Sequence, residues 1–166
     1  MACVVDGCVN GAPFAGIVLT AGSVLRADDA AGPVLSKKME DEPIPGWYTI
    51  DGGQTPEDDI IEVKRVRPPR LVLVDAADMA LPVGEVRLLT KHDVSKKSMF
   101  TTHSLPLSIL IEEIEASCDD IAFIGIQPGD TEFYSPMSPE VFDAVDRIYA
   151  ALASGGDLSI FSPLHE

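Results

Sequence analysis

The feature that most constrains the fold is an alternation of short apolar runs with segments of helical apolar spacing. Ile17-Val18-Leu19 lies at the centre of the first apolar run, and Arg70 to Val74 is the most strongly β-like run in the chain. Strands that alternate with helices are typical of an open α/β sheet. The sequence therefore predicts strands at residues 15–21, 47–50, 70–74, 84–89 and 121–126.

Prolines and apolar spacing set the predicted helices between these strands. One helix follows the Asp28-Asp29 loop and ends before Pro43, and a short one begins at Thr55-Pro56 and ends near Lys64. Two more are predicted from apolar residues that recur at helical spacing. Their apolar stripes are Leu107, Leu110, Ile111 and Ile114 in the first, and Val141, Val145, Ile148 and Leu152 in the second.

Length and charge bound the class of protein. The chain has 166 residues, 46% of them hydrophobic, which fits one globular domain. With 27 acidic and 12 basic residues the net charge is -15, so nucleic acid and anionic membranes are poor candidate partners. No apolar run reaches the roughly 18 residues of a membrane span. We expect a cytoplasmic protein that acts as a monomer. The basic stretch Lys64 to Arg70 is interpreted as a solvated loop, with docking of an acidic partner as the alternative.

Three cysteines give no disulfide framework and no zinc motif. Cys3 and Cys8 lie in a leading segment, residues 1–14, which we interpret as a loosely attached extension, with a redox or metal role for the two thiols as the alternative. Cys118 stands beside Asp119 and Asp120, whose charges should raise its pKa rather than activate it. The domain is predicted to cover residues 15–156, and residues 157–166 form a tail without a clear secondary structure.

Two acids and one histidine follow β-type runs and form the candidate site. They are Asp29, Asp75 and His103. If the strands are parallel neighbours, these side chains meet at one sheet edge, where ligands bind in open α/β sheets. A cation would relieve the repulsion between the carboxylates. Each residue also has an ordinary structural interpretation, as a helix cap, a turn cap or a hydrogen-bonded histidine. No phosphate-binding, dinucleotide, serine-hydrolase or zinc-peptidase motif is present.

Several blocks of residues, in order, resemble a known family. From about Gly22 to about Leu152 the chain resembles the endopeptidases that mature the large subunit of nickel-iron hydrogenases, most closely the hydrogenase 3 (formate hydrogenlyase) branch. The blocks that carry the resemblance are Gly22-Ser23, Asp28-Asp29, Gly32-Pro33, Ile50-Asp51-Gly52-Gly53, Pro56-Glu57-Asp58-Asp59, Val74-Asp75-Ala76-Ala77-Asp78-Met79, Pro82-Val83-Gly84-Glu85, Thr101-Thr102-His103-Ser104-Leu105-Pro106-Leu107, Phe123-Ile124-Gly125-Ile126-Gln127-Pro128 and Tyr134-Ser135-Pro136-Met137.

The resemblance implies a fold, a reaction and a set of site residues. The fold is a single three-layer α/β domain with a twisted, mixed, mostly parallel sheet of about five strands between helices. The reaction is removal of a short C-terminal peptide from the large-subunit precursor after nickel insertion, with the precursor's nickel as the recognition signal. The metal-reading residues fall on Asp29, Asp75 and His103, and other divalent cations can occupy the same site. Oxygen and imidazole ligands would contact nickel without extracting it. Asp29 or its neighbour Asp28 is the expected base for hydrolysis.

The first loop departs from the family pattern at three positions. Where the family has asparagine this chain has Ser23, and two glycines are replaced by Ala27 and Ala30. Alanine adopts positive φ only at a cost, so these changes bear on loop geometry. They also motivate one alternative function, a non-catalytic nickel or hydrogenase-subunit chaperone on the same scaffold. A second alternative is a small-molecule or nucleotide-binding α/β domain without a metal.

Overall fold

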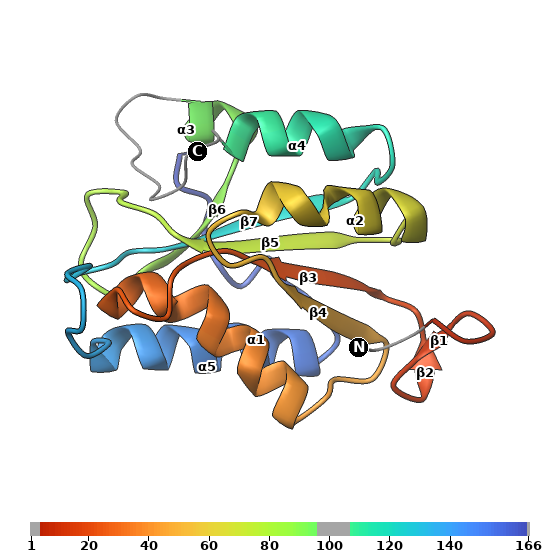
Figure 1. The fold of residues 1–166 in the computed structure, drawn as a ribbon, viewed down its shortest axis with the longest axis horizontal. Coiled ribbons are helices and arrows are strands. Elements are labelled where there is room, and N and C mark those ends of the chain that lie inside the picture. The colour runs from red at the N-terminus through yellow and green to blue at the C-terminus, as the bar shows by residue number, and fades with distance from the viewer. Residues whose placement is uncertain (1–3, 96–106, 166) are drawn as a thin grey trace.

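A five-stranded sheet lies between two layers of helices in the computed structural model, which describes residues 4–95 and 107–165 (Figure 1). The strand order is β4-β3-β5-β7-β6. The first four of these strands are parallel, and β6 runs antiparallel to β7 at one edge. This confirms the predicted mixed, mostly parallel sheet. The strands are β3 (Gly16–Thr20), β4 (Trp47–Asp51), β5 (Leu71–Ala76), β6 (Val86–Leu89) and β7 (Ile121–Ile126).

The helices cover opposite faces of the sheet. Helices α1 and α5 lie together on one face, and α2, α3 and α4 lie on the other (Figure 1). The helices predicted from apolar spacing are confirmed within a few residues, whereas α3 was not predicted. The bounds are α1 (Ala31–Asp41), α2 (Ile60–Val66), α3 (Lys91–Ser95), α4 (Leu107–Glu115) and α5 (Pro139–Ala153), with short 3-10 helices at Ala27–Ala30 and Pro56–Asp59.

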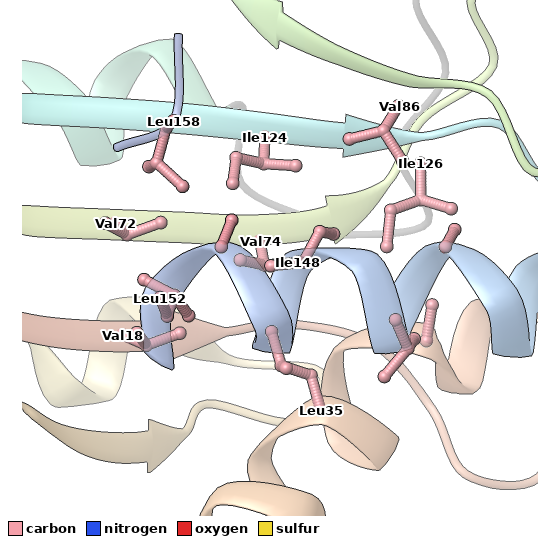
Figure 2. Packing of buried hydrophobic residues seen from close by; sticks show 14 of the residues in the cluster. Val18, Leu35, Val72, Val74, Val86, Ile124, Ile126, Ile148, Leu152 and Leu158 are labelled. Carbon is pink, nitrogen blue, oxygen red and sulfur yellow. The ribbon is translucent and has the colours of Figure 1, made fainter. Parts of the chain in front are cut away.

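Side chains alternate along the buried strands and so build two cores. On β3, Val18 packs with the α1 and α5 cluster, while Ile17 and Leu19 pack with the α2 and α4 cluster. Successive residues of a strand point to opposite faces, which is why all of β3 is buried and the centre of the strand is apolar on both faces. Figure 2 shows the first cluster, in which Ile148 and Leu152 of α5 lie against the sheet.

The described part of the leading segment packs on the domain, so the expectation of loose attachment is wrong for residues 4–14. Strands β1 (Cys8–Val9) and β2 (Ala12–Pro13) form a hairpin, and Val9 is buried in the second core cluster. The Asn10 side chain donates to the carbonyl of Trp47 at 2.7 Å, and the ring of Phe14 stacks on Tyr48. The hairpin therefore covers the beginning of edge strand β4. Cys3 lies outside the described residues.

The chain after α5 protects the other sheet edge. The amide of Leu88 on β6 donates to the carbonyl of Ser162, and the amide of Leu164 donates back to Leu88, both at 3.0 Å. Leu158 and Phe161 are buried in the first core cluster. Edge strands with unpaired backbone groups invite aggregation, and this segment removes that hazard at β6. Residues 157–165 are thus an integral part of the domain.

Most of the basic stretch is paired within the chain. Lys64 contacts Glu113 at 3.0 Å, Arg65 contacts Glu62, and Arg70 contacts Asp120 at 3.3 Å. Exposed ion pairs contribute little to stability, but they lower the local positive charge. The geometry is that of a solvated connection into β5. In the described part of the chain, no helix is both long and apolar enough to span a bilayer.

Leu158→Ala tests whether the C-terminal segment belongs to the folded unit. Leu158 is 1% exposed, so removing its side chain should lower the free energy of unfolding by about 2–4 kcal/mol. Ile160→Ala, two residues along and 65% exposed, is the matched control and should change it by less than about 0.5 kcal/mol. Urea denaturation measures both. Equal free energies of unfolding in the two variants would show that the C-terminal segment is not part of the folded unit.

Candidate active site at the carboxyl edge of the sheet

The carboxyl ends of β3 and β5 form the candidate site. The two strands are parallel neighbours, and just past their paired residues the amide of Ala21 donates to the carbonyl of Val74 at 3.0 Å. After β3 the chain passes through α1 to β4, which pairs with β3 on the side away from β5. On its own far side, β5 pairs with β7. Connections diverge at such a point and leave a crevice, which is where ligands bind in open α/β sheets.

Asp29 lies in the 3-10 helix that follows β3. It is 1% exposed, and its Oδ2 accepts a hydrogen bond from the amide of Ser23 at 3.0 Å. Gly22 fixes this approach, because it has φ +140° and a Cβ there would stand 2.0 Å from the carbonyl oxygen of Asp29. Only glycine fits between the two segments. The loop is therefore folded back on the end of β3, with the Asp29 carboxylate held at the sheet edge.

Asp75 is the penultimate residue of β5, not a residue of an exposed loop. It is 1% exposed and pairs in register with Gly125 of β7. Leu71 and Leu73 belong to the core cluster of α2 and α4, so the two-residue period places the Asp75 side chain on that same face. Asp75 thus lies at the carboxyl edge of the sheet, as predicted, and its side chain is buried there.

His103 lies outside the described residues. Its place in the sequence is between α3 and α4, two helices that pack together over the sheet face on which Asp75 lies. Within residues 4–95 and 107–165 there is no group of three His, Cys, Asp or Glu side chains arranged to hold a metal ion. The structure thus brings the Asp29 and Asp75 segments to neighbouring strand ends, and the three-residue site stays a prediction.

Asp28, the alternative base, is a hub of hydrogen bonds. Its side chain is fully buried and accepts from the amides of Gly129 (2.8 Å), Asp130 (3.2 Å) and Ser138 (2.6 Å). The hydroxyl of Ser138 donates as well, at 2.8 Å. A carboxylate offers about four acceptor sites, so four donors occupy most of its capacity. Asp28 clamps the loop after β3 to the loop after β7.

Two contributors to the site were not found from the sequence. Ser138 opens α5 as predicted, yet its hydroxyl bonds to Asp28 instead of capping the helix. Gln127, 6% exposed at the end of β7, accepts from the amides of Met79 (2.7 Å) and Leu81 (3.2 Å) and so holds the loop after β5. A polar residue directly after a buried strand is the only sequence signal for such a clamp.

The two alanine substitutions have different consequences. Ala27 adopts φ +47°, the left-handed conformation that a glycine takes easily. Ala30 has φ -77° in the α region and lies directly before α1, so no strain arises there. Alanine therefore adopts the left-handed conformation at position 27, and position 30 does not require glycine. The chaperone alternative, which was motivated by these changes, gains no support from the backbone.

Cys118 is not an activated nucleophile. Burial raises the pKa of its thiol, and the charges of Asp120 and Asp119 raise it further, to a smaller extent. The thiol donates weakly to the carbonyls of Pro68 and Asp120, at 3.4 and 3.3 Å. The pKa of this thiol is raised as predicted, but burial and not the two acids is the main cause.

Comparison with known proteins decides the family. The family model described as HycI, hydrogenase maturation protease, matches residues 33–154. The chain belongs to the hydrogenase maturation protease family. It is similar to the hydrogenase 3 maturation protease of Escherichia coli strain K12, with 40% identity over 136 residues that cover 82% of this chain and 87% of the relative.

Solved structures of maturation proteases share the fold. The crystal structure of a hydrogenase 3 maturation protease superposes with a TM-score of 0.85 at 37% identity and covers 92% of this chain and 98% of that one. A NiFe hydrogenase maturation protease, HycI from Thermococcus kodakarensis, gives a TM-score of 0.74 at 25% identity, with 91% and 94% covered. The three-layer domain predicted from the family resemblance is confirmed.

Ala27→Gly should stabilise this maturation protease. Glycine relieves the left-handed strain, and we expect the free energy of unfolding to rise by about 1 kcal/mol. Ala30→Gly is the control. Residue 30 has helical backbone angles at the beginning of α1, so glycine there should lower the free energy of unfolding. Thermal and urea denaturation of the two variants should move in opposite directions. A loss of stability in Ala27→Gly would contradict the presence of backbone strain at Ala27.

Asp28→Asn separates a structural role from a catalytic one. An asparagine amide turns a donor toward amide groups that are themselves donors, so the free energy of unfolding should fall by about 2–4 kcal/mol. Asp130→Asn, an exposed acid in the loop after β7 that Asp28 binds, should change it by less than about 0.5 kcal/mol. A fully stable Asp28→Asn protein that has lost only peptidase activity would instead make Asp28 the base.

Proposed function

We propose that this protease removes the C-terminal extension of a nickel-iron hydrogenase large-subunit precursor after nickel has been inserted. The observation that carries the proposal is the pair of buried acids, Asp29 and Asp75, at neighbouring parallel strand ends. Membership of the maturation protease family and the 40% identity to the E. coli hydrogenase 3 enzyme support the substrate class.

Nickel enters this proposal as part of the substrate. Asp29 and Asp75 supply oxygen ligands and His103 supplies an imidazole, a donor set that binds nickel less firmly than thiolates do. A nickel ion held mainly by the precursor would therefore be contacted and left in place. Two acids buried at one edge of a chain with net charge -15 also favour a cation over any anionic ligand. Binding through the ion makes cleavage depend on completed nickel insertion.

Hydrolysis needs the scissile bond to be positioned and a water to be activated. Contact with the precursor's ion would fix its tail against the ends of β3 and β5, and holding the reacting groups in place supplies much of the rate. We assign the base to Asp29, because the four donors to Asp28 already commit that carboxylate to the loops. The Ser23 amide orients the Asp29 carboxylate for this role.

Asp29→Asn and Asp75→Asn test the proposal. Both substitutions keep shape and remove the charge, so release of the C-terminal peptide from a nickel-loaded precursor should fall by about 100-fold or more. Asp119→Asn, an exposed acid just before β7 and so at the opposite edge of the sheet, should process at the wild-type rate. Mass spectrometry of the released peptide measures all three.

The same assay separates the parts of the proposal. A nickel-free precursor should stay intact. Its cleavage at the normal rate would refute recognition through nickel but would leave the proposed peptidase activity standing. A stable complex of wild-type protein with an uncut nickel-loaded precursor would favour the chaperone function. His103→Ala extends the test to the third predicted ligand.

A further inference from the structure

Two loops beside the candidate site place apolar side chains on the surface. Val24 and Leu25 follow β3, and Phe133 and Tyr134 follow β7. Their exposed fractions are 69%, 49%, 60% and 83%, although most large apolar side chains of the described chain are buried. We call these four residues the apolar loop surface. Exposed apolar side chains that gather from separate segments mark interaction sites more often than scattered ones do.

The apolar loop surface is held together and does not consist of loose ends. The amide of Tyr134 donates to the carbonyl of Leu25 at 2.8 Å, which joins the two loops directly. The Arg26 guanidinium lies 5.0 Å from the ring centre of Phe133, and its Nε donates to the carbonyl of Thr131 at 3.2 Å. Both loops are also tied through the Asp28 clamp. A surface ordered in advance loses little entropy on binding.

Tyr134 combines exposure with backbone strain. It adopts φ +64°, which is rare for a bulky residue, and it has the largest exposed fraction among the large apolar side chains. Strain of this kind persists where the surroundings impose it and clusters at sites of function. Tyrosine is also among the residues that contribute most to binding at protein interfaces. Its ring lies at 46° to that of Phe133, with 6.1 Å between the ring centres, and remains 83% exposed.

We propose that the apolar loop surface docks an apolar stretch of the large-subunit precursor next to the scissile bond, an inference that rests on the proposed function. The surface is continuous with the site, because Asp28 binds the loop of Phe133 and Tyr134 while its neighbour Asp29 lies at the strand ends. Asp130 and Glu132 are exposed at its border, and the chain is strongly acidic. The docked stretch therefore lacks acidic residues and has neutral or basic neighbours.

The double variant Val24→Ser with Tyr134→Asn tests the docking. Both side chains are exposed, and asparagine tolerates the left-handed backbone of position 134, so the fold is retained. The Michaelis constant for nickel-loaded precursor should rise at least about tenfold, with kcat within about twofold of wild type. The control, Ile61→Ser with Ile160→Ser, removes two apolar residues of comparable exposure, 77% and 65%, outside these loops and should leave both constants unchanged.

Binding of the intact precursor, measured by biolayer interferometry on the same proteins, separates this inference from the proposed function. Equal Michaelis and dissociation constants for the two double variants overturn the docking and leave the cleavage standing. If the wild type does not cleave, the proposed function fails, and a tenfold weaker dissociation constant for the Val24 and Tyr134 variant alone still supports docking. A wild-type dimer that this variant converts to a monomer assigns the surface to a second copy and overturns the proposal.

Discussion

The arrangement of the site depends on one buried carboxylate. Asp28 accepts hydrogen bonds from residues 101 to 110 positions away in the sequence, which joins the connection after β3 to the connection after β7. A buried charge is costly unless donors surround it, and here four donors do so. The position of Asp29 follows from this clamp, because it is the next residue of the same short helix. The apolar loop surface follows from it as well.

The sheet could be predicted from the sequence because its signal is local. Val18 faces one core while Ile17 and Leu19 face the other, so a strand buried on both faces appears as a continuous apolar run. The hairpin around Val9 and the segment around Leu158 have no such run. The hairpin contributes one buried side chain, and the segment around Leu158 contributes two, Leu158 and Phe161, to cores built by distant residues. Short segments that are ordered by tertiary contacts carry no period from which they could be predicted.

The site was predictable to the level of strand ends and no further. Asp29 and Asp75 are found because each follows a β-type run, and parallel neighbours bring such positions to one edge. Two adjacent carboxylates cannot be told apart by sequence pattern alone. Asp28 bonds to Gly129 and Ser138, and only the folded chain shows that these donors approach it instead of Asp29. Gln127 is similar, since its partners Met79 and Leu81 come from another connection.

The left-handed backbone of Ala27 shows what determines this loop. Alanine takes φ +47° there although the left-handed region costs it about 1–2 kcal/mol. The conformation must then be imposed by neighbouring contacts, and these are present on both sides. Gly22 leaves room for the Asp29 carbonyl, and the Asp28 backbone amide donates to the carbonyl of Asp130 at 2.9 Å. A glycine at position 27 would make the loop easier to form without defining its shape. Loss of that glycine therefore affects stability first, and the placement of Asp29 is preserved.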